Sequence, residues 1–411
     1  MPIIVQKYGG TSVGSVERIL AVADRVVAAR EAGNDVVVAV SAMGHTTDEL
    51  LEMARQITDL PEPRELDMLL TAGERIAMSM LGIALNARGC RAASYTGSQA
   101  GIITDTRHGA AKIIEIRPKR ILEALADGNV VVLAGFQGLS SAYEITTLGR
   151  GGTDLTAVAM AAALEAEVCE IYTDVEGVFT ADPRMVPGAR KLDQVSYEEM
   201  LELAASGAKV LYPRSVEYAR RHGVRLHVRS SFVDEAGTWV QEVTQSDMEG
   251  VMISGVALDD DEAKVTLDRV PDHPGVAAKV FKAIAEESVN VDMIVQNVSH
   301  DGRTDLSFTA PLADLHLLEN VLGRIVKEIG AERFTIDDGV AKVSLVGAGM
   351  KSHPGVAADM FDVLAAEGIN IEMISTSPIR ISCVIRKVDG ERAVQAVHER
   401  FGLSSDGTSE A

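Results

Sequence analysis

The stretch His273 to Ala278 reads HPGVAA, and the same six residues recur at His353 to Ala358. The offset of 80 also matches further pairs: Phe281 with Phe361, Asn290 with Asn370, and Met293 with Met373. Self-similarity at a fixed spacing indicates two copies of one structural module. The repeat therefore decides the fold of the C-terminal part of the chain.

Each copy has the pattern of a small α/β module. A short β-like run, AKVTL from Ala263 or AKVSL from Ala341, leads through the His-Pro-Gly turn into an amphipathic helix. In the first copy, two strands, a helix and a last strand follow, which predicts a ferredoxin-like β-α-β-β-α-β fold. The second copy ends in the polar tail LSSDGTSEA and lacks a fourth strand. Because an unpaired sheet edge is costly, we expect VMISGVAL at 251–258 to fill it.

The first 245 residues have a different pattern, in which short apolar strands alternate with long helical stretches. This alternation predicts an α/β fold whose mostly parallel sheet is sandwiched by helices. The polar stretch EVTQSDME at 242–249 is the predicted linker. The expected domains are an N-terminal α/β domain at 1–245, a first module at 263–338 inserted in a second module formed by 249–262 and 339–405, and a flexible tail at 406–411.

Composition and charge exclude several classes of protein. The chain has 39 Lys and Arg against 60 Asp and Glu, a net charge of −21, and its aromatic content is 4%. A chain this acidic is unsuited to binding phosphate backbones, so we expect no nucleic-acid partner. The cysteines Cys90, Cys169 and Cys383 form no C-x-x-C pair, and no window reaches about 18 uninterrupted apolar residues. We therefore expect a cytoplasmic protein that makes no contact with a membrane.

Two glycine-rich segments follow predicted strands, where open α/β sheets bind ligands. KYGGTSVG, from Lys7 to Gly14, joins the first strand to a helix whose free amides favour an anion. It is not a Walker P-loop, because Ser15 stands where the lysine should be. TLGRGGTD, from Thr147 to Asp154, brings an arginine, three glycines and a carboxylate to a helix start. A third segment, 171–184, is equally compatible with an ordinary turn-rich loop.

KYGGTSVG, SAMG, TAGE, TLGRGGTD, TDVEGVFTADPR and GAKVLYPRS, in this order and followed by twin HPGV modules, resemble the aspartokinase family. The resemblance covers almost the whole chain. It implies an amino-acid kinase fold with two C-terminal ACT domains, and ATP-dependent phosphorylation of the side-chain carboxylate of L-aspartate. The product would be 4-phospho-L-aspartate, the entry to lysine, threonine and methionine biosynthesis. The expected cofactors are ATP and Mg²⁺, with no dedicated protein metal site.

The resemblance also implies roles for individual residues. Lys7 would steady the transferring phosphoryl group, Lys209 would contact the nucleotide, and Asp154 would orient the lysines or the metal. Arg150 would hold a carboxylate of the substrate and Glu74 its ammonium. The remaining nucleotide contacts would be Tyr8, Gly9, Gly10, Thr173, Asp174, Phe179, Asp182 and Arg184. The remaining substrate contacts would be Ser41, Thr47, Gly151, Gly152 and Thr153.

The ACT resemblance implies allosteric binding of lysine, threonine or both. The predicted contacts in the first copy are Asp272, Gly275, Ala277, Asn290, Asp292 and Gln296. Those in the second copy are Ser352, Gly355, Asn370 and Glu372. The carboxylates at Asp292 and Glu372 offer acceptors for a ligand's ammonium. His273 and His353 are interpreted as turn residues.

Several alternatives remain at this stage. Another amino-acid kinase, acting on glutamate, N-acetylglutamate, carbamate or a nucleoside monophosphate, would share the fold. A non-catalytic sensor of amino acids would share the ACT modules. The expected assembly is a homodimer through the ACT domains, or a heterotetramer with a C-terminal subunit initiated at Met248 or Met252.

Overall fold

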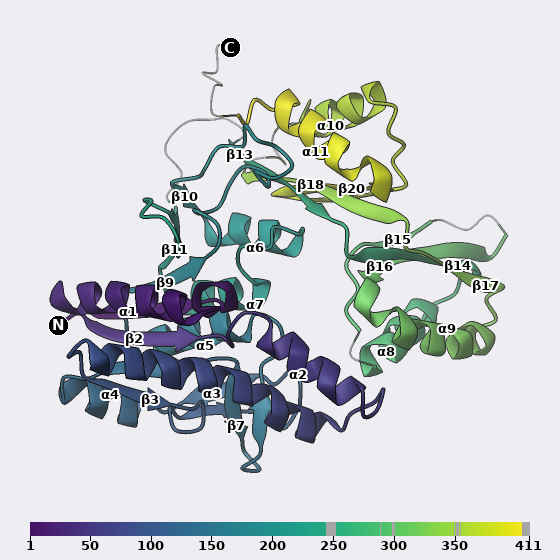
Figure 1. Cartoon of the computed structure of the whole chain (residues 1–411). Coiled ribbons are helices and arrows are strands. Elements are labelled where there is room, and N and C mark those ends of the chain that lie inside the picture. Colours follow the sequence, from purple (N-terminus) through teal and green to yellow (C-terminus); the bar gives the residue numbers. More distant parts are fainter. Residues whose placement is uncertain are drawn as a thin grey trace. The chain divides into compact units, whose positions relative to one another are not determined.

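The computed structural model describes residues 1–243, 252–287, 289–297, 301–348, 350, 353 and 355–404. They divide into two compact units. The first comprises Met1–Val178, Lys191–Ala205 and Lys209–Asp247, and the second comprises Phe179–Arg190, Ser206–Ala208 and Met248–Ala411. Figure 1 shows the elements of each unit.

The first unit is built on a sheet with the strand order β10-β12-β11-β9-β1-β2-β6-β3. The six strands from β11 to β3 are parallel, and β12 is antiparallel to β11. This confirms the predicted mostly parallel α/β fold. The strands are β1 (Ile3–Tyr8), β2 (Asp35–Val40), β3 (Ala92–Tyr95), β6 (Val130–Ala134), β9 (Val168–Thr173), β10 (Gln194–Val195), β11 (Leu226–Ser230) and β12 (Thr238–Val240).

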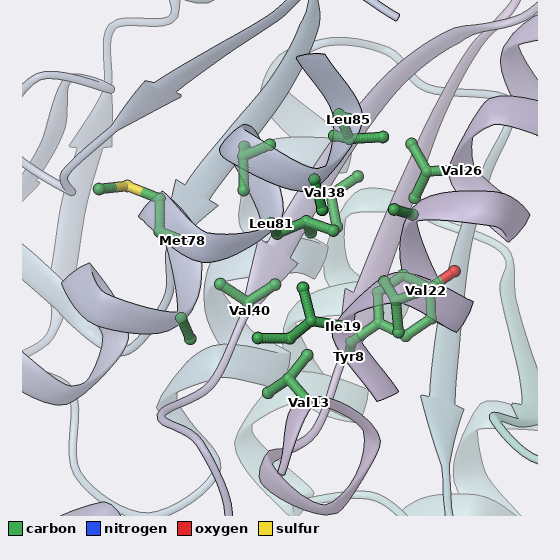
Figure 2. Packing of buried hydrophobic residues seen from close by; sticks show 14 of the residues in the cluster. Tyr8, Val13, Ile19, Val22, Val26, Val38, Val40, Met78, Leu81 and Leu85 are labelled. Carbon is green, nitrogen blue, oxygen red and sulfur yellow. The ribbon is translucent and has the colours of Figure 1, made fainter. Parts of the chain in front are cut away.

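Helices cover both faces of this sheet. Figure 2 shows one face, where side chains of β1 and β2 pack against α1 and α3 around Tyr8, Val38 and Leu81. Helix α5 packs on the other face, against β1, β2 and β9. The strands β2 and β6 are apolar on both faces because both faces are buried. The helices are α1 (Val16–Glu31), α2 (Thr46–Arg55), α3 (Pro63–Ala87), α4 (Lys119–Ala126), α5 (Gly152–Ala163), α6 (Tyr197–Ala205) and α7 (Pro213–His222).

Helix α3 is, within the described part of the chain, the one helix long and apolar enough to cross a membrane. Over half of its most apolar window is buried inside the protein, as in a core helix. A small second sheet with the order β5-β4-β7-β8 lies in the same unit. Its strands, which the sequence patterns did not predict, are β4 (Ile102–Thr104), β5 (Ile113–Ile116), β7 (Gln137–Ser140) and β8 (Ile145–Thr147).

The second unit holds both copies of the repeat. The first copy forms the sheet β15-β16-β14-β17 with helices α8 and α9, and the second forms β13-β18-β20-β19 with α10 and α11. Strand β13 pairs with β18, so the first copy lies between these two strands in sequence. The elements are β13 (Met252–Asp259), β14 (Glu262–Pro271), α8 (Val276–Glu286), β15 (Ile294–Gln296), β16 (Arg303–Pro311), α9 (Leu315–Ile329), β17 (Arg333–Asp337), β18 (Val340–Ala348), α10 (Gly355–Ala366), β19 (Met373–Ser377), β20 (Arg380–Arg386) and α11 (Gly390–Arg400).

Candidate active site and regulatory site

An ion pair marks the centre of the candidate active site. Lys7 Nζ on β1 lies 2.7 Å from Asp154 Oδ1 on α5, and both side chains are largely buried. A Cβ atom on Gly9 would lie 3.3 Å from Lys7 Nζ, so the ammonium rests over the glycine backbone. The carboxylate balances one positive charge, while the glycine leaves the ammonium and nearby backbone accessible to an anion. The structure thus brings together the first and second glycine-rich segments predicted from the sequence.

The SAMG segment lies directly beside the first glycine-rich segment. Gly44 N donates to Gly10 O over 3.0 Å, and a Cβ on Gly10 would lie 3.0 Å from the oxygens of Ala42 and Gly44. Ser41 Oγ donates to Thr153 Oγ1 over 3.0 Å, which links this segment to α5. A side chain at position 10 would separate the two segments. Glycine is therefore required here for close packing.

Glu74 on α3 is a buried carboxylate that points into the same region. Its Oε1 accepts from Ala42 N over 3.2 Å, whereas its Oε2 is buried and lacks a hydrogen-bond partner within the described residues. Burial raises the pKa of Glu74 to about 7. A buried acceptor without a donor costs free energy, which a ligand's ammonium would recover. The role predicted for Glu74, to hold the ammonium of the substrate, stays a prediction.

The second glycine-rich segment makes a tight turn ahead of α5. Gly149 and Gly151 have φ angles of 78° and 69°, in the left-handed region that favours glycine. A Cβ on Gly151 would lie 2.2 Å from the Tyr212 ring, so the segment that carries Lys209 and Tyr212 packs against this turn. Arg150 and Lys209 are exposed. Thr47 is half-buried in the first turn of α2.

The residues predicted for nucleotide binding divide between the two units. Thr173 and Asp174 lie at the end of β9, beside β1. The Tyr8 side chain is fully buried and stacks on Tyr172 with ring centroids 4.7 Å apart, and burial raises its pKa. Phe179, Asp182 and Arg184 belong to the second unit, where Arg184 Nη2 and Asp182 Oδ2 form a 2.6 Å ion pair.

Sequence reasoning missed a further segment at this site, Gly135-Phe136, which follows β6. A Cβ on Gly135 would lie 2.5 Å from the Thr153 side chain, and Phe136 N donates to Thr156 Oγ1. Phe136 has a φ of 67°, unusual for a residue with a side chain. The signal that could have found it is its place directly after a buried strand. No group of three or more His, Cys, Asp or Glu that could hold a metal occurs among the described residues.

In the first ACT-like copy, a cavity of about 360 Å³ opens beside the His-Pro-Gly turn. Four of the six residues predicted there line it, namely Asp272, Gly275, Ala277 and Gln296. Gly275 precedes α8 with a φ of 97°, so the cavity lies at a helix N-terminus, which favours an anion such as a carboxylate. Thr304 and Leu306 of β16 form part of the wall.

The predicted acceptors for a ligand's ammonium are ion-paired between the two copies. Asp292 of the first copy contacts Lys342 of the second over 2.6 Å, and Glu372 of the second contacts Lys264 of the first over 2.9 Å. Asn290 and Asn370 are exposed, and Gly355 begins α10. Ser352 lies outside the described residues.

Comparison with known proteins defines the class first. Residues 2–230 match the Amino acid kinase family, and residues 264–330 and 343–401 each match an ACT domain. The chain is 56% identical to the aspartokinase of Mycolicibacterium smegmatis over 410 residues, which cover 99% of this chain and 97% of that one. The chain belongs to the amino acid kinase family and, within it, to the aspartokinases, as its motifs predicted.

Two solved structures of Escherichia coli aspartokinase III are similar to the whole chain. The complex with aspartate and ADP, described as the R-state, has a TM-score of 0.83 at 26% identity and covers 97% of this chain and 99% of that one. The complex with lysine and aspartate, described as the T-state, has a TM-score of 0.72 at 27% identity with the same coverage. These ligands are those of the Escherichia coli protein.

Proposed function

We propose that this protein transfers the γ-phosphoryl group of ATP to the side-chain carboxylate of L-aspartate, giving 4-phospho-L-aspartate and ADP. The observation that carries the proposal is the Lys7–Asp154 ion pair, which lies between two glycine-rich segments, with the partnerless Glu74 oxygen beside the SAMG segment. Anion-binding and ammonium-binding groups thus lie in one unit. Family membership and the aspartate complex of the Escherichia coli relative support the choice of substrate.

The chemistry needs positioning and positive charge rather than a base. The acceptor carboxylate, with a reference pKa of about 3.9, is already ionised at neutral pH. Its oxygen attacks the γ-phosphorus while the bond to the β–γ bridging oxygen breaks, and ADP takes the electron pair. Lys7 and the backbone at Gly9 and Gly10 would oppose the repulsion between the two anions. Lys209 would add charge on the nucleotide.

Substrate recognition would divide between two charged groups. Arg150 would pair with a carboxylate of aspartate, and Glu74 would accept the ammonium. Burial raises the pKa of Glu74 to about 7, and an ammonium beside the carboxylate would favour its ionised form. Ser41, Thr47 and the 151–153 turn would donate hydrogen bonds to the acidic groups of the substrate.

The donor set fits Mg²⁺ as the companion of ATP. Mg²⁺ keeps most of its waters and binds through one or two carboxylates together with substrate phosphates. Asp154 is the carboxylate placed beside Lys7, and its charge would orient that lysine or the metal. A bound Mg²⁺ would neutralise part of the charge on the phosphates.

The decisive assay incubates the protein with Mg-ATP, L-aspartate and hydroxylamine. We expect aspartyl hydroxamate to form, and Lys7→Ala to lower turnover by roughly a thousandfold while the chain stays folded by circular dichroism. Lys119→Ala, at an exposed lysine on α4, is the matched control and should keep full activity. ADP release driven by glutamate or carbamate without hydroxamate from aspartate would favour another kinase of this fold. Binding without turnover would favour a sensor.

For regulation, we propose that lysine, threonine or both bind the cavity of the first ACT copy. The α8 N-terminus would receive the α-carboxylate, and Asp272 and Gln296 offer acceptors to an ammonium. Lysine in one complex of the Escherichia coli relative supports this ligand class. Titrating lysine and threonine singly and together into the hydroxamate assay tests it. Inhibition by neither would reject the proposal.

We also propose a cytoplasmic enzyme that assembles through its ACT domains. The assembly would be a homodimer, or a heterotetramer with a C-terminal subunit translated from Met248 or Met252. Residues 244–249 of the linker, Met248 among them, lie outside the described residues. Size-exclusion chromatography with light scattering measures the mass of the assembly, which differs between a homodimer and a heterotetramer. A denaturing gel would show a second, smaller band only for the heterotetramer.

A further inference from the structure

Asp67, which no motif singled out, is a buried carboxylate with hydrogen-bond partners on both of its oxygens. It lies on α3 with 1% of its surface exposed. His108 Nδ1 lies 2.7 Å from its Oδ2, and Gly109 N and Thr147 Oγ1 donate to its Oδ1 over 3.1 and 2.6 Å. A buried carboxylate is tolerated only when such donors surround it. Asp67 therefore joins three elements: helix α3, the 105–112 loop and the last residue of β8.

A second set of hydrogen bonds, from Arg214 on α7, joins the 105–112 loop to the residues that follow β8. We call this set and the Asp67 set the two clamps. Arg214 Nη1 donates to Leu148 O over 2.5 Å and its Nη2 donates to Ala111 O over 2.9 Å. Between the clamps, Ala111 N donates to Thr147 O over 2.9 Å. The fork of the guanidinium fits two carbonyl oxygens at once, which fixes their spacing. The 105–112 loop is thus a rigid support for Thr147 and Leu148.

These clamps hold the residues that immediately precede Arg150. Thr147 and Leu148 are fixed, whereas Gly149 and Gly151 on either side of the arginine have the backbone freedom of glycine. A Cβ on Gly149 would lie 3.0 Å from Gly109 O, so the support loop touches the turn itself. The direction in which Arg150 leaves the turn consequently depends on the support loop.

The same helix carries the other half of the substrate site. Glu74 follows Asp67 by seven residues, which is two helical turns, so both lie on one face of α3 about 10 Å apart. Helix α3 therefore positions both groups that would bind the substrate. Glu74 would contact one side of the substrate directly, and Asp67 would fix the turn that carries Arg150 on the other side.

We propose that Asp67, with His108 and Thr147 as its donors, is a positioning residue that fixes the Arg150 turn for the carboxylate of the substrate. The proposal rests on the function proposed above. Loss of one donor loosens the turn while α3 and the Lys7–Asp154 pair stay in place. The affinity for the acidic amino acid falls, and the affinity for ATP does not.

The test compares His108→Leu, His108→Asn and Thr147→Val in the full chain. The amide nitrogen of asparagine can take the place of imidazole Nδ1, so His108→Asn keeps the donor that His108→Leu removes. We expect the KM for aspartate to rise about tenfold in His108→Leu and Thr147→Val, with the KM for ATP within twofold, and to recover in His108→Asn. His316→Leu, at an exposed histidine on α9, is the matched control.

A KM for aspartate within twofold of the parent in both donor-deleting variants would overturn the proposal, as would an equal rise in both KM values. Failure of the proposed function gives a different result, namely no aspartyl hydroxamate from the unmodified protein. In that case, the change in KM for the acid that the enzyme does phosphorylate is compared with the change in KM for ATP. In the absence of any turnover, calorimetry measures the dissociation constants for aspartate and ATP in each variant, and their changes are compared in the same way.

Discussion

The two ACT copies share the HPGVAA turn but are assembled differently. The hydrophobic core of the first copy uses residues of one continuous stretch, from Val265 to Ile336. The core of the second copy also takes Val256 of β13 and residues of the Phe179–Arg190 segment, namely the buried Ala181 and Val186 and the partly buried Met185 and Ala189. The first copy has a cavity beside its turn, while the second is bound to segments from elsewhere in the chain. The same HPGVAA motif thus stands in two different structural contexts.

Two ion pairs between the copies are related by an approximate symmetry, but their lysines differ in burial. Lys264 lies on β14 and Lys342 on β18, and each pairs with an acid just before β19 or β15 of the other copy, Glu372 or Asp292. Lys342 is 1% exposed and contacts Asp259, Glu262 and Asp292, whereas the Lys264 side chain is 23% exposed. Burial lowers the pKa of Lys342, but Glu262 and Asp292 outweigh this effect and raise the pKa above its ordinary value.

The largest predicted effect comes from Lys342→Met. It leaves a buried cluster of acids without its cation, which should lower the free energy of unfolding by about 3–5 kcal/mol. Lys264→Met is the matched variant in the other copy, and its partly exposed pair should contribute less than about 1 kcal/mol. Calorimetric melting of the full chain measures both. Equal destabilisation by the two variants would show that the Lys342 cluster contributes no more to stability than the Lys264 pair.

The second prediction concerns the cavity. Gln296→Ala removes a polar group from the cavity of the first copy, and we expect the effector concentration for half-inhibition to rise about tenfold. Thr376→Ala changes the matching position of the second copy, at the offset of 80, and should leave this concentration within twofold. Aspartyl hydroxamate formation at fixed substrate levels measures both. A stronger effect of Thr376→Ala would assign the effector to the second copy.

Sequence patterns predicted much of the fold because its signals are local. The repeat, the apolar strands β2 and β6, and the glycine-rich segments at strand ends are each visible within a short window. Neighbouring residues of a strand point to opposite faces, and this separates Lys7 at the site from the core residue Tyr8.

The contacts that sequence reasoning missed join residues far apart in the chain. Asp67 meets Thr147 from 80 residues away, and Arg214 meets Leu148 from 66. A single aspartate in an amphipathic helix has no pattern that distinguishes it from a solvent-exposed one. The pairing of Asp292 with Lys342 also depends on the tertiary packing of the two copies, which no short motif encodes.

A third prediction, for Asp292→Ala, concerns a smaller effect than Lys342→Met at the same cluster. The carboxylate is 34% exposed and Lys342 keeps Asp259 and Glu262, so we expect a loss of about 1 kcal/mol in the free energy of unfolding. Glu372→Ala is the reciprocal variant. If Asp292 also receives an effector's ammonium, half-inhibition by lysine or threonine should need a roughly tenfold higher concentration, with the uninhibited rate unchanged. Destabilisation without relief of inhibition would mean that Asp292 joins the copies through Lys342 and Arg380 and binds no effector.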